Sequence, residues 1–206
     1  MQFPRKEYTE MQPHFPTIYL IRHGETEWSL SGQHTGTTDI PLTEQGKIQA
    51  TLLGRKLQNY PFKTVLCSPL KRALMTCELA NLSSQKQIEP LLKEWNYGDY
   101  EGLTTSHILK KDPSWNVFKE GAPHGESPEQ VQKRAMLLLE KLSEVQGDVA
   151  LISHGHFLRA LATVWLGLPI EAGTLFFLSP ASVSILGHER HIKAITLWNS
   201  TFHLHQ

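Results

Sequence analysis

Residues 148–153 read DVALIS, and HGHF and an apolar helical pattern through Trp165 follow them directly. An uninterrupted apolar run of this length is typical of a strand buried on both faces of a parallel sheet. A second run, TIYLIR at 17–22, also ends immediately before a histidine and a glycine, His23 and Gly24. The sequence therefore predicts two buried strands, each with an imidazole at its carboxyl end.

Strand and helix patterns alternate through the rest of the chain. This alternation predicts an α/β fold with three layers, α/β/α, and a mainly parallel central sheet, in which ligands bind beyond the carboxyl ends of the strands. The expected helices lie at 43–57, from Ser68-Pro69 onward and at 127–145, and the expected further strands lie at 63–67, at 87–92 and, two or three of them, after residue 174.

The bulk composition excludes several classes of protein. The 206 residues suffice for one domain with a sizeable core, expected at 17–206 after a flexible N-terminal segment at 1–16. Lys plus Arg and Asp plus Glu number 20 each, which argues against nucleic-acid and membrane partners. The N-terminal stretch is polar and rich in proline, so we expect a cytoplasmic protein without a signal peptide. Cys67 and Cys77 are too few for a disulfide framework and are expected to be packing residues.

Arg22 and His23 at the end of the first strand suit the binding of an anion. A neutral imidazole is a competent nucleophile toward phosphorus, and a planar guanidinium matches two phosphate oxygens. An isolated Arg-His pair is more often a satisfied packing pair than a site. Two further groups strengthen the functional interpretation: Arg72, expected in the first turn of a helix whose N-terminus favours phosphate, and His154 at the end of the second strand.

Glu94 follows an apolar stretch and precedes Trp95, a setting suited to a general acid, although a surface glutamate is the commoner alternative. A metal site is an alternative, because the chain has eleven histidines, among them His154 and His156. No carboxylate or cysteine lies at ligand spacing from these two, and the nearby arginines would repel a cation. We therefore expect neither a metal nor a cofactor.

Four blocks of sequence resemble the signature blocks of the histidine phosphatase superfamily, also called phosphoglycerate mutase-like, in the family's order. They are LIRHGETEW at 20–28, CSPLKRALMT at 67–76, KEWNYGDYEG at 93–102 and LISHGHFLRA at 151–160. The resemblance implies a phosphohistidine on His23 and phosphoryl oxygens held by Arg22, Arg72 and His154. It also implies that Glu94 protonates the leaving group and later deprotonates water.

The stretch 26–43 and the pattern W-N-x-F-x-x-G-x-x-x-G-E at 115–126 are similar to sedoheptulose-1,7-bisphosphatase-type members of that superfamily. This similarity implies that the hydroxyl of Thr35, the backbone N–H of Gly36 and the hydroxyl of Tyr97 contact substrate. Ser29 stands where the mutase pattern has asparagine, so it is a further candidate of the substrate pocket and weakens the case for a mutase.

The function expected is that of a metal-independent phosphatase for small phosphate esters, such as sedoheptulose 1,7-bisphosphate and other sugar phosphates. Two alternatives stay open: a 2,3-bisphosphoglycerate-dependent phosphoglycerate mutase and a catalytically inactive regulatory or binding protein. The oligomeric state is open as well, because the apolar C-terminal strands can either complete the sheet or pair with another subunit in a homo-oligomer.

Overall fold

The computed structural model describes residues 16–205, in which a six-stranded sheet has the order β3-β2-β4-β1-β5-β6. The strands are β1 (Ile18–Arg22), β2 (Thr64–Cys67), β3 (Lys86–Ile88), β4 (Val149–Ser153), β5 (Val183–Glu189) and β6 (Ile192–Ser200). The strands β3, β2, β4 and β1 pair in parallel, whereas β5 and β6 add an antiparallel edge. The predicted α/β class with a mainly parallel sheet is confirmed.

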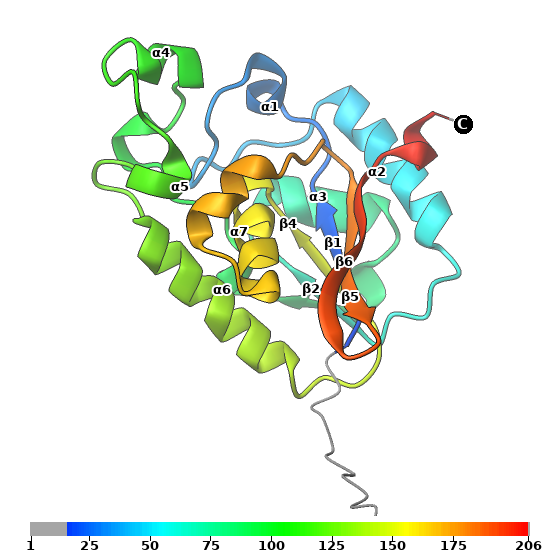
Figure 1. Cartoon of the computed structure of the whole chain (residues 1–206). Helices are drawn as coiled ribbons and strands as arrows, with labels where there is room; N and C mark the ends of the chain where they lie inside the picture. Colours follow the sequence, from blue (N-terminus) through cyan, green and yellow to red (C-terminus); the bar gives the residue numbers. More distant parts are fainter. Residues whose placement is uncertain (1–15, 206) are drawn as a thin grey trace, which may run out of the picture.

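Helices cover both faces of this sheet (Figure 1). The larger ones are α2 (Glu44–Leu57) and α3 (Lys71–Leu79) on one face and α6 (Pro128–Leu142) and α7 (Gly155–Leu166) on the other. Short helices α1 (Glu27–Ser31), α4 (Thr105–Leu109) and α5 (Val117–Glu120) lie in the loops beyond the carboxyl ends of the parallel strands. Short 3-10 helices occur at Ser83–Gln85, Pro90–Leu92, Gly98–Tyr100, Ile170–Leu175 and Phe202–Leu204.

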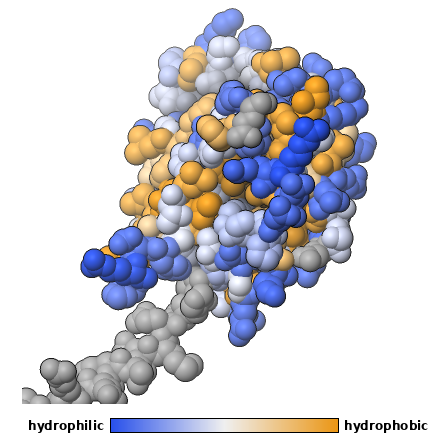
Figure 2. Space-filling model, turned by 90° about the vertical axis from the view of Figure 1, so that its right-hand side faces the viewer, coloured by the Kyte–Doolittle hydropathy of each residue, from blue (hydrophilic) through white to orange (hydrophobic). Residues whose placement is uncertain are grey.

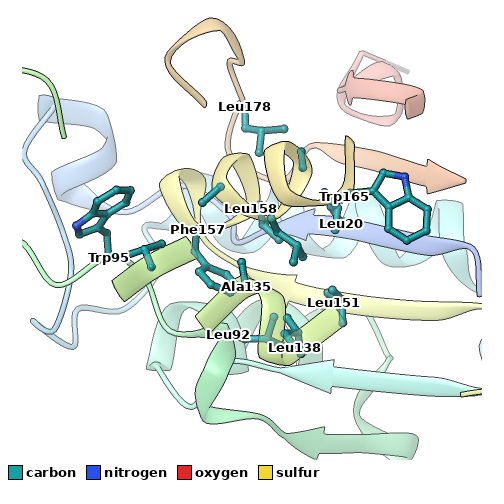
Figure 3. Packing of buried hydrophobic residues seen from close by; sticks show 14 of the residues in the cluster. Leu20, Leu92, Trp95, Ala135, Leu138, Leu151, Phe157, Leu158, Trp165 and Leu178 are labelled. Atoms are coloured by element: carbon teal, nitrogen blue, oxygen red, sulfur yellow. The ribbon is translucent and has the colours of Figure 1, made fainter. Parts of the chain in front are cut away.

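The alternation of side chains along β1 builds the two apolar layers. Ile18 and Leu20 pack in the larger cluster with α6 and α7, and Tyr19 and Ile21 pack in the smaller cluster with α2 and α3. Figure 3 shows Leu20 with residues of the larger cluster around it. Each face of the strand is thus buried, which explains its continuous apolar run. Cys67 and Cys77 lie in the smaller cluster without a disulfide bond, as packing residues should.

Two predicted elements differ from the structure at their ends. The strand expected at 87–92 ends at Ile88, because Pro90 has no N–H to donate to a ladder. The helix expected to begin with a Ser68 cap begins instead at Lys71, and its first N–H donates to Oδ1 of Asp39 at 2.6 Å. The prediction of Ser68 as the N-cap is therefore wrong.

The N-terminal segment, the domain boundaries and the oligomeric state stay predictions. The N-terminal segment 1–16 lies, apart from Pro16, outside the described residues, so its flexibility and the boundaries of a single domain stay predictions. Figure 2 shows hydrophobic and hydrophilic residues interspersed over one face of the molecule. Ile192, Leu197 and Phe202 are exposed on and after β6, and homo-oligomerisation stays a prediction. Between residues 16 and 205, no helix is both long enough and apolar enough to cross a membrane.

Candidate active site

Two neighbouring parallel strands bring the predicted histidines together. Strands β1 and β4 pair side by side, with Arg22 opposite Ser153. The backbone N–H of His23 donates to the carbonyl oxygen of Ser153 at 3.0 Å, which aligns the two strand ends. The ring centroids of His23 and His154 therefore lie 5.2 Å apart, as expected for residues at one carboxyl edge of a parallel sheet.

A hydrogen bond holds His23 in the tautomer that a nucleophilic imidazole needs. It is buried, and its Nδ1 lies 2.7 Å from the carbonyl oxygen of Gly24. Because a carbonyl only accepts, Nδ1 carries the proton and Nε2 keeps its lone pair. Burial holds the pKa of His23 well below its ordinary value of 6.5, and the positive charges of Arg72 and Arg22 lower it further. The imidazole is therefore neutral at pH 7.

His154 is fully buried, and both of its ring nitrogens have protein partners. Arg72 donates its Nε–H to Nδ1 at 3.1 Å, so Nε2 carries the proton and donates to Oγ of Ser68 at 2.7 Å. Burial, and after it the charge of Arg72, holds the pKa of His154 well below 6.5. The terminal nitrogens of Arg72 donate to the carbonyl oxygens of Thr35, Gly36 and Thr38. Arg72 and His154 thus form a buried network behind His23.

Arg22 has an N–H group that no described residue accepts. One of its terminal nitrogens donates to the carbonyl oxygen of Leu178, but its buried Nε–H has no hydrogen-bond partner among the described residues. Burial lowers the pKa of Arg22, with the field of Glu94 opposing that effect. A buried donor left unsatisfied costs about 1–3 kcal/mol. This positive charge with a free N–H is suited to an anionic oxygen.

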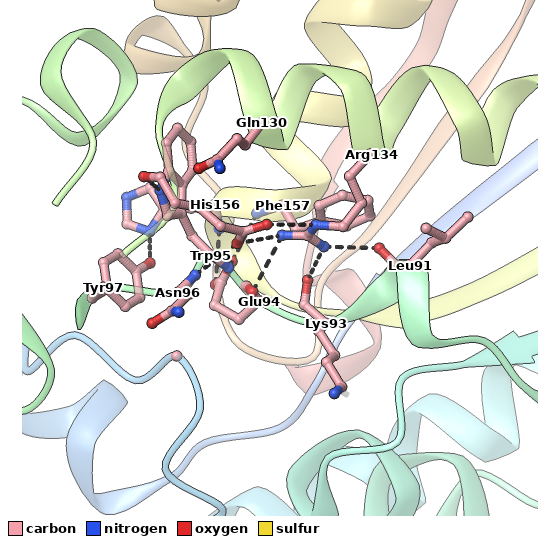
Figure 4. A network of polar contacts seen from close by, with 12 residues as sticks. Leu91, Lys93, Glu94, Trp95, Asn96, Tyr97, Gln130, Arg134, His156 and Phe157 are labelled. Atoms are coloured by element: carbon pink, nitrogen blue, oxygen red, sulfur yellow. Dashed lines mark hydrogen bonds and ion pairs between the residues drawn. The ribbon is translucent and has the colours of Figure 1, made fainter. Parts of the chain in front are cut away.

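Glu94 is held by the backbone N–H group of the next residue and by two N–H groups at the start of α7. Its Oε1 accepts from the N–H groups of Trp95 and Phe157, both at 2.8 Å, and its Oε2 accepts from that of His156 at 3.1 Å (Figure 4). Arg134 supports the same loop, because it donates to the carbonyl oxygen of Glu94. These contacts fix the carboxyl group in one orientation, where it can exchange protons with a bound molecule.

Of the five predicted catalytic residues, Arg22, His23 and Glu94 line a cavity of about 230 Å³. Arg72 and His154 are not part of this lining and belong to the buried network instead. The lining combines charged and hydrogen-bonding side chains with apolar ones. The lining residues are Arg22, His23, Trp28, Ser29, Gly32, Gln33, His34, Thr35, Glu94, Tyr97, Thr105, Gly155, His156, Arg159, Phe177 and Leu178. In residues 16–205 no group of three or more His, Cys, Asp or Glu side chains is arranged to hold a metal ion.

Three of the four residues predicted to bind substrate line the cavity. The hydroxyl of Ser29 belongs to the capping box of α1 with Thr26, and the hydroxyl of Thr35 donates to the carbonyl oxygen of Gln33 at 3.3 Å. The hydroxyl of Tyr97 lies 2.6 Å from Nδ1 of His156.

Gly36 differs from these three. It lies outside the lining of this cavity, and its N–H donates to Oε1 of Glu101 at 2.8 Å. The expected contact between this N–H and a substrate therefore requires Glu101 to move away.

The sequence patterns indicated no catalytic or substrate-binding role for Ser68, His34, His156 or Arg159. His156 had only the alternative role of a metal ligand, and Arg159 follows it by three residues, the spacing that puts two side chains on one face of a helix. That spacing was the available signal for Arg159. His34 belongs to the aperiodic stretch after Gly24, and no pattern in the sequence marked it.

Comparison with known proteins shows which family the chain resembles. The model of the histidine phosphatase superfamily (branch 1) matches residues 18–201. An acid phosphatase of Mycobacterium tuberculosis is 43% identical over 192 residues, which span 90% of this chain and 93% of that protein. The sedoheptulose 1,7-bisphosphatase of Saccharomyces cerevisiae is 32% identical over 188 residues, which span 76% of this chain and 69% of that protein. A solved structure from Mycobacterium tuberculosis has a TM-score of 0.83 and 42% identity, and it covers 89% of this chain and 97% of that chain.

Proposed function

Because the chain belongs to the histidine phosphatase superfamily and is a phosphatase, we propose that it releases phosphate from small phosphorylated metabolites through a phosphohistidine on His23. The observation that carries this proposal is the hydrogen bond from Nδ1 of His23 to the carbonyl oxygen of Gly24. It leaves Nε2 of a neutral, buried imidazole with a free lone pair. Arg22, whose Nε–H has no partner among the described residues, lines the same cavity.

In the first half of the reaction, Nε2 of His23 attacks phosphorus and the bond from phosphorus to the ester oxygen breaks. The bonding electron pair leaves with that oxygen, which takes a proton from the carboxyl group of Glu94. Arg22 binds phosphoryl oxygens with its free N–H and its positive charge. Arg72 and His154 supply further positive potential and donors, and His154 can donate to a phosphoryl oxygen once its Nε2–H leaves Ser68.

In the second half, the Glu94 carboxylate takes a proton from a water molecule. The resulting hydroxide attacks phosphorus, the N–P bond breaks, and the electron pair returns to Nε2 of His23. Inorganic phosphate leaves, and Glu94 again carries the proton that the next leaving group needs. No metal ion takes part in these proposed steps.

The substrates that we propose are sugar phosphates, with sedoheptulose 1,7-bisphosphate as an example, in the cytoplasm. The cavity wall supports this class, because Tyr97, His34 and His156 present a phenol and two imidazoles that can bond to sugar hydroxyls. Burial lowers the pKa of His34 to about 4 and that of His156 well below 6.5, so both rings are neutral at pH 7 and can donate and accept. The yeast relative named for a sugar bisphosphate supports the same class.

The test is phosphate release from sedoheptulose 1,7-bisphosphate, fructose 1,6-bisphosphate, 3-phosphoglycerate and an aryl phosphate, with a chelator present. We expect release that is abolished by His23→Ala in a protein that keeps its fold, and an acid-labile phosphoenzyme in the unmodified protein alone. Transfer of phosphate between phosphoglycerates without release to water would support a mutase instead. Full activity of a folded His23→Ala protein would exclude the phosphohistidine.

A further inference from the structure

Arg159 brings a second guanidinium to the wall of the cavity, from the second turn of α7. Its Nε–H donates to the carbonyl oxygen of Gly173 at 2.9 Å, and one terminal nitrogen donates to that of Thr174 at 3.4 Å. The guanidinium carbon lies 4.8 Å from the ring centroid of Phe118. The other terminal nitrogen makes no hydrogen bond to any described residue, so the guanidinium is held on one edge and free on the other.

The positive charge of Arg159 has no carboxylate partner in the described part of the chain. None of the ion pairs within residues 16–205 includes it. Burial lowers its pKa, and the nearby charge of Arg22 acts in the same direction, while Glu94 opposes them. Glu94 is already bonded to three backbone N–H groups. A partly buried charge is costly unless it is paired, so this position favours an anion from outside the chain.

Arg22 and Arg159 are two cationic points in the lining of one cavity. Arg22, beside His23, is the point at which the transferred phosphoryl group is proposed to bind. The lining also includes the uncharged side chains of His34, Tyr97 and His156, which suit a polar, uncharged body of a substrate. A molecule that fills the cavity and pairs with both arginines therefore carries one anionic group at the reacting end and another elsewhere.

We propose that Arg159 forms a second anion subsite, which selects phosphate esters whose leaving group carries a carboxylate or a second phosphate. The proposal rests on the proposed phosphatase reaction and adds the class of leaving group. The free terminal nitrogen of Arg159 donates to the second anion, while its bonds to Gly173 and Thr174 keep the guanidinium in place. Arg159 takes no part in breaking or forming the bonds to phosphorus.

A purely structural role is the competing explanation, since Arg159 also ties α7 to the 3-10 helix Ile170–Leu175. The variant Arg159→Met keeps an apolar stem over Phe118 but removes the charge, and Arg159→Lys keeps the charge without the fork of donors. A structural role predicts that Arg159→Met slows all substrates equally. The subsite predicts a loss that depends on the second anion and that Arg159→Lys partly restores.

The experiment compares kcat and KM for pairs that differ in the second anion: 3-phosphoglycerate with glycerol 3-phosphate, and fructose 1,6-bisphosphate with fructose 1-phosphate and fructose 6-phosphate. We expect Arg159→Met to lower kcat/KM about 10- to 100-fold for the doubly anionic member, mostly through KM. Losses for the singly anionic members and for an aryl phosphate should be far smaller. A preference confined to the carboxylate pair or to the bisphosphate identifies the second anion. The matched control is Arg55→Met at an exposed position of α2, which should change nothing.

Binding provides a readout that does not need turnover. In the His23→Ala protein, titration calorimetry with fructose 1,6-bisphosphate and with 3-phosphoglycerate should show weaker binding when Arg159→Met is added. Weaker binding with no turnover by the unmodified protein would support the subsite and overturn the proposed reaction. Equal losses for both members of every pair, together with unchanged binding, would overturn the subsite and leave the reaction standing.

Discussion

Arg72 donates its Nε–H to Nδ1 of His154 across 3.1 Å, and this hydrogen bond decides which nitrogen of the imidazole carries its proton. The proton is placed on Nε2, which points to Ser68. Because Arg72 is fully buried, its side chain holds the network of the site as well as contributing charge to it. A lysine at this position would keep the charge and lose the geometry.

The variant Arg72→Lys is therefore expected to be poorly active and less stable. One ammonium cannot reach Nδ1 of His154 and the carbonyl oxygens of Thr35, Gly36 and Thr38 together. Each buried acceptor left unsatisfied costs about 1–3 kcal/mol. Urea unfolding and phosphate release measure the two losses, with the exposed Arg55→Lys as the control. Unchanged stability and activity in Arg72→Lys would show that charge alone suffices.

The stability of the protein should fall as the solution is acidified from pH 7 to pH 5. Burial keeps the pKa of four site histidines below 6.5: His23, His34, His154 and His156. Between pH 6.5 and about 4, the value for His34, the unfolded chain binds more protons than the folded chain, so acidification favours unfolding. His34 alone predicts a loss of about 2 kcal/mol by pH 5.

The measurement is the free energy of urea unfolding at pH 7 and at pH 5, for the unmodified protein and for His34→Gln. Glutamine does not titrate, so the variant should lose less stability on acidification than the unmodified protein. An identical pH dependence in both proteins would mean that His34 has the same pKa in the folded and unfolded chains.

Glu94→Gln should slow the release of sugar leaving groups about 10²- to 10⁴-fold. The amide can neither protonate the leaving oxygen nor take a proton from the attacking water. An aryl phosphate needs little protonation to depart and should be slowed much less. Steady-state rates on the two classes, with single-turnover measurement of phosphohistidine formation, check this difference. If formation limits both reactions and both are slowed equally, Glu94 is not the acid.

The sequence predicted those parts of the fold that depend on local signals. The apolar runs of β1 and β4 marked the strands, and the histidine after each strand marked the site, because parallel strands share a carboxyl edge. The glycine after His23 also has a packing role that the local pattern does not contain, since a methyl group on Gly24 would lie 2.5 Å from the carbonyl oxygen of Gly46.

Contacts between distant segments were not predictable in the same way. Ser68 precedes Pro69 and so has the local pattern of a helix cap, yet Asp39, from another loop, accepts the first N–H of α3. This leaves the hydroxyl of Ser68 for His154, 86 positions away in sequence. Glu101 similarly takes the N–H of Gly36. Periodicity and capping rules contain no information about such pairings, which depend on how the loops fold over the sheet edge.

The close packing of Gly24, Glu25 and Gly46 gives a last prediction. A methyl group on Gly46 would lie 2.1 Å from the carbonyl oxygen of Glu25, which is backbone and cannot rotate away. Alanine normally stabilises a helix interior relative to glycine by about 1 kcal/mol, but overpacking of this kind costs about 1–3 kcal/mol. Gly46→Ala should therefore lower the free energy of unfolding.

Gly155→Ala in the first turn of α7 is the matched control for Gly46→Ala, because the nearest atom to its added methyl is Cζ of Arg22 at 3.5 Å, an ordinary contact. It should leave the free energy of unfolding nearly unchanged. Because Glu25 is two residues from His23, relief of the clash at Gly46 also shifts the nucleophile, so kcat should fall in Gly46→Ala. Normal stability together with normal kcat in that variant would mean that the loop after β1 can move without disturbing His23.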